Sequence, residues 1–403
     1  MADAIDKNVA ESARENRLMA GWRDKAVEVG EGIWIIMLAA WVLIQPLLVT
    51  AGQAIAAAPK ALWQWWSSLD AAAQRRYFLG LGAILALLYT WSWREVPGHW
   101  MAYQSGERPL YAAKTWHYQL DKVVVDDLVK INTDVLVTDY GTMGGRVPLP
   151  AAEVTRLKTR ADGRKRIVLA YMSVGEAERF RFYFKDEWKT DPPEWLGAEN
   201  CAWPDAFKVQ FWHDGWKDIV WRGRKAYLKQ IIDAGFDGVY LDRVDIYDQY
   251  PDNSDARDQM IKFVSDLSAL AKKLKPGFLI VPQNADDLLS EPEYRAVIDG
   301  LGREDLLYGT KGTGMRNPGH EIHEAQERLD LLRWEWKPIL AVEYLQTADA
   351  IAAAAKELKA RGLVGTIQPR SLDGTDPTAP VDLTKNIGTT EYTKANCEKG
   401  KAW

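Results

Sequence analysis

Acidic and polar side chains repeatedly follow short apolar runs between residues 110 and 370. The run GVYLD at 238–242 ends in Asp242, and Asp245 follows closely. A buried parallel strand is a nearly continuous apolar run, so a carboxylate at its end lies at the edge of an α/β fold where catalytic groups gather. A single aspartate there would more simply cap the next helix. The pattern recurs, however, at Asp139 and Tyr140, Glu176 and Glu178, Gln283 and Asn284, Glu304, Glu343 and Tyr344, and Gln368 and Arg370. A ring of such residues predicts a functional pocket.

This set of residues favours acid/base chemistry by carboxylates. No matching set of His and Cys accompanies the acids, and His320 and His323 lack the HExxH spacing of a zinc protease, so we predict neither a metal ion nor a cofactor. Hydrolysis of a glycosidic bond needs two carboxylates that face each other across a sugar ring. Asp242 and Glu304 are the candidates for that pair. Trp and Tyr are dense between residues 183 and 221, and we expect about half of them to stack on sugars and the others to form core.

Eight apolar runs predict the strands that must position these residues. They lie at 115–120, 134–140, 166–175, 238–242, 277–284, 296–302, 337–345 and 363–370. Amphipathic segments separate most of them, and several of these segments end at glycine, as helices often do. This alternation predicts an α/β fold, a (β/α)8 barrel of the TIM type. A doubly wound sheet is the alternative, but no GxGxxG opens a helix after the first strand.

The N-terminal part of the chain has a different composition. Residues 32–59 carry no charge, and GIWIIMLAAWVLIQPLLVT within them is long enough to cross a bilayer of about 30 Å as a helix. A second apolar run at 77–93 is just long enough, as a helix, to cross the hydrocarbon core of a bilayer. The Trp-rich connector between the two runs suits the headgroup region. Small residues after the first run would also fit a cleaved signal peptide, and a buried core helix is the alternative for the second.

The predicted domain organisation has four parts. They are an N-terminal surface segment at 1–31, a two-helix transmembrane hairpin at 32–99, the barrel at 100–380 and a C-terminal tail at 381–403.

The charge distribution limits the partners of the chain. The formal net charge is -5, and no basic block or nucleic-acid motif is present, so we predict no nucleic-acid partner. The charges of residues 1–99 cancel, which leaves the acidic excess on the barrel, where it would suit a cationic polymer. Lys and Arg near the outer ends of the predicted hairpin outnumber those in its connector, which favours a cytoplasmic barrel, whereas Arg75 and Arg76 directly before the second run favour the opposite side.

Six segments of the barrel region occur in a familiar combination: SVGEAERFRFYF, ENCAWPDAFKVQFWHDGW, GFDGVYLDRVD, QNADDLL, GREDLLYG and KPILAVEYL. Together they resemble the endo-α-1,4-polygalactosaminidase family of glycoside hydrolases, over about Trp116 to Arg370. The resemblance implies a (β/α)8 barrel and a polysaccharide substrate that contains α-1,4-linked galactosamine. It also implies that Asp242 is the nucleophile and Glu304 the general acid/base.

The resemblance extends to the residues that bind substrate and to the compartment. It places Asp139, Tyr140, Glu176, Asn284 and Tyr344 at the sugar subsite, and their positions add Asp245, Glu343 and Arg370 as further substrate-binding candidates. It implies a periplasmic barrel at a bacterial inner membrane, in contrast to the side that the Lys and Arg distribution favours.

Two functions follow from these patterns. The first is a membrane-anchored, endo-acting glycoside hydrolase whose partners are a polysaccharide and the lipid bilayer. The second is a non-catalytic barrel that serves as an accessory subunit of a larger complex with other integral-membrane proteins. The intact acid pair favours the enzyme, whereas two membrane segments favour the complex, because a hydrolase needs only one tether and extra helices usually pack against something.

Overall fold

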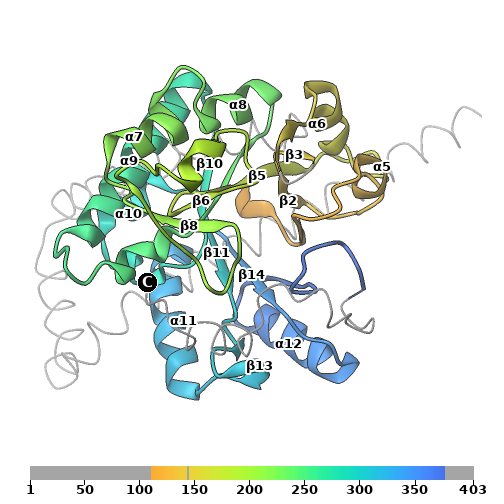
Figure 1. Ribbon diagram of the computed structural model, residues 1–403. Helices are drawn as coiled ribbons and strands as arrows, with labels where there is room; N and C mark the ends of the chain where they lie inside the picture. Colours follow the sequence, from red (N-terminus) through yellow and green to blue (C-terminus); the bar gives the residue numbers. More distant parts are fainter. Residues whose placement is uncertain (1–109, 143–144, 377–403) are drawn as a thin grey trace, which may run out of the picture. The chain divides into compact units, whose positions relative to one another are not determined.

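Eight parallel strands form the centre of the structure, a computed structural model that describes residues 110–142 and 145–376 (Figure 1). They are β1 (Trp116–Gln119), β2 (Val135–Asp139), β5 (Ile167–Ser173), β9 (Gly238–Asp242), β10 (Leu279–Pro282), β11 (Leu301–Glu304), β14 (Ile339–Glu343) and β15 (Val364–Ile367). All eight predicted strands are therefore present. We call the end of the barrel at which these strands finish the upper face and the opposite end the lower face.

The strands close into a barrel through two weaker junctions. Strands β1, β2, β5, β9 and β10 form one sheet in that order, and β11, β14 and β15 form another. A parallel bridge between Gln283 and Gly302 joins the sheets on one side. On the other side, the backbone N–H of Leu120 donates to the carbonyl of Leu372 at 2.8 Å. The predicted α/β barrel is confirmed.

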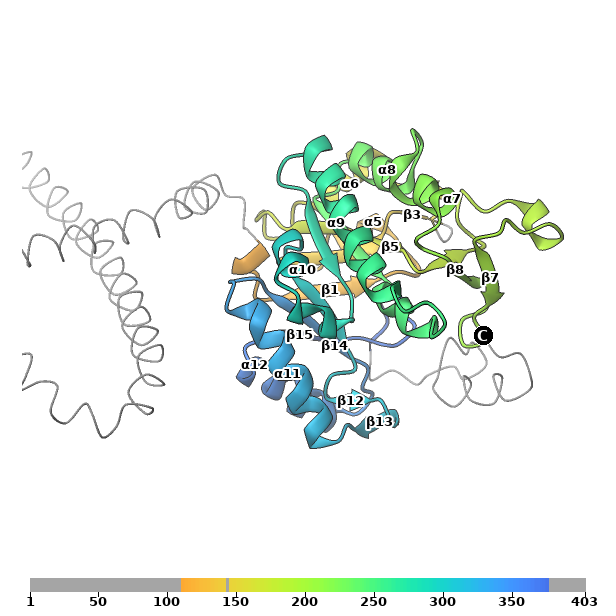
Figure 2. The same ribbon diagram turned by 90° about the vertical axis from the view of Figure 1, so that its left-hand side faces the viewer.

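A helix follows each of the first seven strands, although several are short. These are α5 (Val125–Leu128), α6 (Ala151–Leu157), α8 (Tyr227–Ala234), α9 (Ala256–Leu274), α10 (Pro292–Val297), α11 (Gly319–Arg333) and α12 (Ala348–Ala360). Figure 2 shows α9, α10, α11 and α12 on the outside of the strands. Short pieces lie between them: η1 (Leu110–Ala112), β3 (Gly141–Thr142), β4 (Val147–Pro148), η4 (Val244–Gln249), η5 (Asp286–Ser290), β12 (Tyr308–Gly309) and β13 (Gly312–Arg316).

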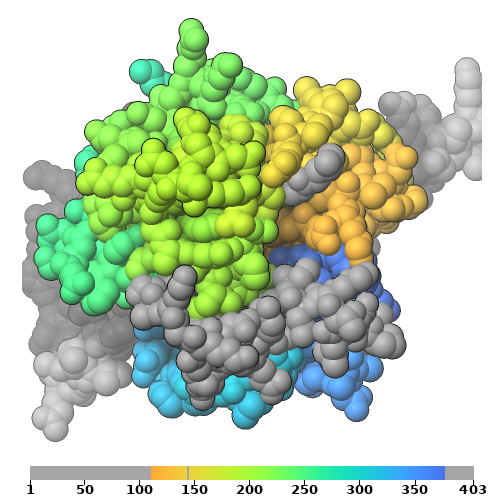
Figure 3. All heavy atoms as spheres, viewed as in Figure 1, coloured from red at the N-terminus to blue at the C-terminus, as the bar shows by residue number. Residues whose placement is uncertain are grey.

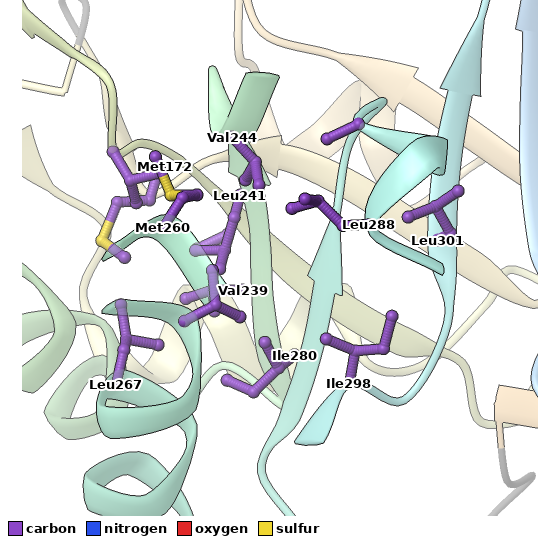
Figure 4. Packing of buried hydrophobic residues seen from close by; sticks show 14 of the residues in the cluster. Met172, Val239, Leu241, Val244, Met260, Leu267, Ile280, Leu288, Ile298 and Leu301 are labelled. Atoms are coloured by element: carbon purple, nitrogen blue, oxygen red, sulfur yellow. The ribbon is translucent and has the colours of Figure 1, made fainter. Parts of the chain in front are cut away.

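Apolar side chains between the strands and the helices form the larger core. Met260 and Leu267 of α9 pack toward Val239 and Leu241 of β9 (Figure 4). Each fully buried side chain of this size contributes roughly 1.5–3 kcal/mol relative to an exposed one. This packing fixes β9, and with it the residue that ends the strand.

Aromatic side chains fill the inside of the barrel. Trp116 stacks on Tyr118, and Tyr240 packs at a tilt against both, with ring centroids 5.2–6.1 Å apart. Gly302 of β11 makes room for them, because a Cβ at this position would lie 1.9 Å from the Tyr240 hydroxyl oxygen. A rigid aromatic floor therefore lies beneath the upper ends of the strands.

A long insertion between β5 and α8 covers part of the upper face. It contains β6 (Glu176–Glu178), η2 (Asp186–Lys189), β7 (Leu196–Glu199), β8 (Ala206–Val209), α7 (Asp214–Lys217) and η3 (Asp218–Arg222). Figure 3 shows it as a continuous yellow-green block. Trp195 and Trp216 are buried in it, and Trp188, Trp212 and Trp221 pack partly buried against the same core. Trp195 and Trp216 therefore belong to the core, and the expectation that about half of these aromatic residues stack on sugars stays a prediction for the partly exposed rings and for Trp203, which is exposed.

The structure shifts one predicted strand, and one predicted segment lies outside the residues it describes. The sixth strand lies at 301–304 rather than 296–302, because Pro292 begins α10 and this helix continues to Val297. The predicted transmembrane hairpin at 32–99 lies outside the described residues, and within 110–142 and 145–376 no helix is long and apolar enough to cross a membrane.

Candidate active site

The structure brings Asp242 and Glu304 together at the upper face. Asp242 ends β9 and Glu304 ends β11, and both side chains are partly exposed. The side chain of Gln283, just after β10, lies between them. Its Nε2 donates to Asp242 Oδ1 at 3.0 Å and to Glu304 Oε2 at 2.5 Å. Because one nitrogen reaches both oxygens, these oxygens lie no farther apart than the about 5.5 Å typical of carboxyl pairs in retaining glycosidases.

The bridging amide is itself held in place. Gln283 is buried, and its Oε1 accepts a hydrogen bond from the Tyr118 hydroxyl at 3.1 Å. Both hydrogens of Nε2 are directed at carboxylates, so the orientation of the amide is fixed by its three partners. Gln283 therefore sets the spacing of the acid pair.

Three donors surround Asp242. Besides Gln283, the Tyr171 hydroxyl donates to Oδ2 at 2.7 Å, and the backbone N–H of Arg243 donates to Oδ1 at 2.8 Å. Hydrogen bonds to an ionised carboxylate are stronger than those between neutral groups. The site thus holds a carboxylate at Asp242 in one orientation.

Glu304 lies in a different environment. Burial raises the pKa of Glu304 to about 7, and the nearby Asp242 carboxylate contributes to this increase. The hydrogen bond from the Tyr344 hydroxyl to Oε1 lowers this pKa against the effect of burial. Asn284 Nδ2 also donates to Oε2 at 3.3 Å. Two carboxyl groups with such different surroundings suit an acid that gives a proton and a partner that stays ionised.

The backbone turns sharply just after the strands that carry the site. Arg243, Asn284, Ala285 and Asp305 all have left-handed φ angles, of 49–60°. Such conformations cost free energy for residues other than glycine, and they cluster at active sites where the surrounding structure holds them. Asn284 illustrates the holding contacts, since its Oδ1 accepts the backbone N–H of Glu304 at 3.1 Å.

A buried ion-pair cluster lies next to Tyr171. Arg181 contacts Asp139 at 2.7 Å and Glu178 at 2.6 Å, and all three residues are buried. The guanidinium carbon of Arg181 lies 5.6 Å from the centroid of the Tyr171 ring. Burial raises the pKa of Glu178 to about 7 despite the opposing effect of Arg181. Asp139 thus supports the wall of the site through Arg181.

Two more arginines connect predicted residues to the site. Arg243 Nε lies 3.0 Å from Glu176, and its Nη1 lies 3.5 Å from Asp245, which is the more exposed of the two acids. Arg370 pairs with Asp305 at 2.8 Å, and its guanidinium carbon lies 4.2 Å from the centroid of the Tyr344 ring. Among the described residues, no three His, Cys, Asp or Glu side chains are grouped to hold a metal ion.

The sequence profile of glycoside-hydrolase family GH114 matches residues 101–382, which include every residue of this site. The chain belongs to family GH114. The resemblance to polygalactosaminidases found in the motifs is thereby confirmed at the level of the family.

Relatives of this GH114 chain occur in distant microorganisms. It is 34% identical over 271 residues to an uncharacterized protein of Deinococcus radiodurans, a match that covers 66% of this chain and 83% of the relative. It is 35% identical over 241 residues to the uncharacterized protein MJ1477 of Methanocaldococcus jannaschii, which covers 57% of this chain and 66% of the relative. Both matches support the family assignment.

A solved glycoside hydrolase domain shares the fold, and a second solved structure matches less closely. The glycoside hydrolase domain of PelA from Pseudomonas aeruginosa matches with a TM-score of 0.50 at 19% identity, over 65% of this chain and 96% of that one. Ega3 of Aspergillus fumigatus, solved in complex with galactosamine, matches with a TM-score of 0.47 at 18% identity, over 64% of this chain and 92% of that one.

Not every predicted site residue of the GH114 barrel reaches the acid pair. Asn284 and Tyr344 contact Glu304 directly. Tyr140 is fully buried, with its ring 4.8 Å from Tyr227 between the sheet and the helices. Glu343 is also fully buried, and its carboxylate accepts the backbone N–H groups of Leu307 and Tyr308. The structure therefore places Tyr140 and Glu343 in the scaffold and not at a sugar subsite.

The sequence interpretation missed two residues of the GH114 site. Tyr171 lies inside the apolar run of β5, so nothing in the pattern distinguished it from core. Gln283 follows an apolar run in the sequence but is not among the predicted site residues. An amide at a strand end, between two strands that end in carboxylates, is the signal that would have identified it.

Proposed function

We propose that this chain is a retaining, endo-acting glycoside hydrolase that cleaves a polysaccharide containing α-1,4-linked galactosamine. The observation that carries the proposal is the single Gln283 nitrogen between Asp242 and Glu304. Inverting enzymes hold their carboxyl groups about 6.5–9.5 Å apart to admit a water molecule. The Gln283 bridge keeps Asp242 and Glu304 closer together than that.

Glu304 acts as the general acid in the first step. With a pKa of about 7 it is largely protonated at slightly acidic pH. It gives its proton to the glycosidic oxygen as the bond to the anomeric carbon breaks. The Asp242 carboxylate attacks that carbon and forms a covalent glycosyl ester.

The second step reverses the roles. Glu304, now ionised, removes a proton from a water molecule, and the hydroxide that forms displaces Asp242 from the sugar. Tyr171 and Gln283 hold Asp242 throughout, so the leaving carboxylate returns to the same hydrogen bonds.

The substrate assignment follows the family and the charge of the upper face. The side chain of Asp245, an acid near the Asp242–Glu304 pair, is 35% exposed. An unacetylated amino sugar carries a positive charge, which an exposed carboxylate would attract. Asp245 and Glu176 both face Arg243, and we propose that a sugar ammonium group binds on this side of the site.

We further propose that the barrel is attached to a membrane and lies on its periplasmic side. The uncharged stretch at 32–59 and the apolar run at 77–93 support attachment. The resemblance to polygalactosaminidases supports the periplasmic side, and the Lys and Arg distribution supports the cytoplasmic one.

Hydrolysis of de-N-acetylated galactosaminogalactan by the full chain tests the proposal. Glu304→Gln and Asp242→Asn should each lower kcat at least about 1,000-fold while the near-UV circular dichroism stays unchanged. Proton NMR of the first product should show retained α configuration. A β product would overturn the retaining mechanism. No cleavage by the wild-type chain, together with stoichiometric co-purification with membrane proteins, would favour the accessory-subunit function.

A further inference from the structure

Two tryptophans are strongly exposed on the lower face, far from the acid pair. Trp334 and Trp336 lie in the turn between α11 and β14, and each is 76% exposed. They are the most exposed of the large apolar side chains in the described part of the chain. Tryptophan is large and seldom left in water without a reason, and it is enriched where one surface meets both water and an apolar phase.

The turn presents these rings on a rigid base. Glu335 between them pairs with Arg295 at 2.6 Å and with Lys337 at 3.1 Å. Trp336 has a left-handed φ of 59°, an uncommon conformation for a bulky residue. The backbone N–H of Trp336 donates to the carbonyl of Arg333 at 2.9 Å, which helps to hold this conformation. The surrounding contacts thus keep both side chains directed away from the barrel.

The charge of the lower face is opposite to that of the upper face. Within the described residues, the loops that lead from a helix into the next strand, with residues 110–115, contain eight Lys or Arg and four Asp or Glu that are not buried. The strand-to-helix loops, with residues 368–376, contain thirteen Lys or Arg and eighteen Asp or Glu that are not buried. The lower loops are therefore basic, although the chain as a whole has a net charge of -5.

The chain also enters the barrel at this face. Leu110 lies in η1 just ahead of the amino end of β1, and 109 residues precede it. Those residues include the uncharged stretch at 32–59. A membrane attachment through the N-terminal part would thus be connected to the same face that carries the two tryptophans and the basic loops.

We propose that the lower face of the barrel docks on an anionic lipid bilayer, with Trp334 and Trp336 among the headgroups and the basic loops toward the lipid phosphates. Exposed aromatic rings beside cationic side chains are the chemistry of interfacial binding. Docking in this orientation points the acid pair away from the membrane, toward soluble polymer. The inference rests on the proposed membrane attachment and is independent of the glycosidase activity.

Hydroxyl-radical footprinting of the full chain in lipid nanodiscs tests the docking. One set of discs contains phosphatidylcholine alone, and the other contains equal parts of phosphatidylcholine and phosphatidylglycerol. Mass spectrometry then gives the oxidation rate of Trp334 and Trp336 relative to that of Trp203, an exposed residue of the upper insertion. We expect this relative rate to be at least five-fold lower in the anionic discs.

Charge reversal provides the matched comparison. Lys114→Glu with Lys359→Glu changes two exposed residues of the lower side and should return the oxidation rate to its value in phosphatidylcholine discs. Lys185→Glu with Lys225→Glu changes two exposed residues of the upper insertion and should leave the protection intact.

Three results would overturn the inference. Equal relative oxidation rates of Trp334 and Trp336 in both kinds of disc, with the chain bound to both, would contradict the docking of the lower face but not the membrane attachment. Failure of the chain to bind either kind of disc would contradict both the docking and the membrane attachment. Protection of the two rings by galactosamine oligosaccharides without lipid would make them a carbohydrate platform instead.

Discussion

Removal of the Tyr344 hydroxyl should move the alkaline limit of activity upward. This hydroxyl donates to Glu304 Oε1 and lowers the pKa of that carboxyl against the effect of burial. A hydrogen bond to a charged group is worth about 1.5–3 kcal/mol, and 1.36 kcal/mol corresponds to one pKa unit. Two effects make the expected pKa shift smaller than this full value. Gln283 and Asn284 still donate to Glu304 in the variant, and in the wild type the Tyr344 hydroxyl also hydrogen-bonds to the protonated form of the carboxyl. We therefore expect Tyr344→Phe to shift the limit upward by about one pH unit.

The assay is the pH dependence of kcat/KM between about pH 5 and pH 9, because the alkaline limb reports the acid of the free enzyme. The wild-type limb should lie near the Glu304 pKa of about 7. Tyr240→Phe is the matched control: the Tyr240 hydroxyl is buried in the same barrel and has no hydrogen-bond partner. The control should keep the wild-type limb. An unchanged or lowered limb in Tyr344→Phe would refute the assignment of Glu304 as the acid that Tyr344 tunes.

Three further predictions concern the residues that hold the site. Gln283→Leu removes the bridge between the carboxylates and should lower kcat/KM about 100-fold, because small displacements of catalytic groups have effects of that size; activity above a tenth of wild type would contradict the positioning role. Arg181→Met leaves two buried carboxyls unpaired and should cost about 3–5 kcal/mol of unfolding free energy in urea titrations, against less than about 1 kcal/mol for Lys130→Met at an exposed pair. Burial raises the pKa of Glu343 from 4.5 to about 7, so the unfolded chain loses this proton first and stability should fall as pH rises through that interval. Urea titrations at pH 5 and pH 7 measure this, and equal stability at both would contradict the raised pKa.

The strands could be predicted from the sequence because each is a short apolar run. Buried parallel strands have no polar face, so their runs are continuous and easy to see. The sixth run was misplaced because a short apolar segment fits a buried helix as well as a strand. Val297 belongs to α10, and Leu301 begins β11.

The site could be predicted only in part, for reasons of strand geometry. Neighbouring residues along a strand point to opposite faces, so Glu343 and Tyr344 could not both reach the same partner. In the structure the Tyr344 hydroxyl donates to Glu304, whereas the Glu343 carboxylate accepts the backbone N–H of Leu307. Tyr171 was hidden for the complementary reason: its ring is part of the aromatic core, and only its hydroxyl belongs to the site.

The unequal charge of the two ends of the barrel has a kinetic consequence. An acidic upper face and a basic lower face give the domain an electric dipole along the barrel axis. A polycation that diffuses toward it experiences a torque that turns the acid pair forward, and it is repelled from the opposite end. Capture of a cationic polymer should therefore be fast in dilute buffer and slow down as the Debye length falls below about 10 Å, near 0.1 M salt. If the substrate is the proposed cationic polymer, the ionic strength of the medium therefore sets how often the barrel captures it.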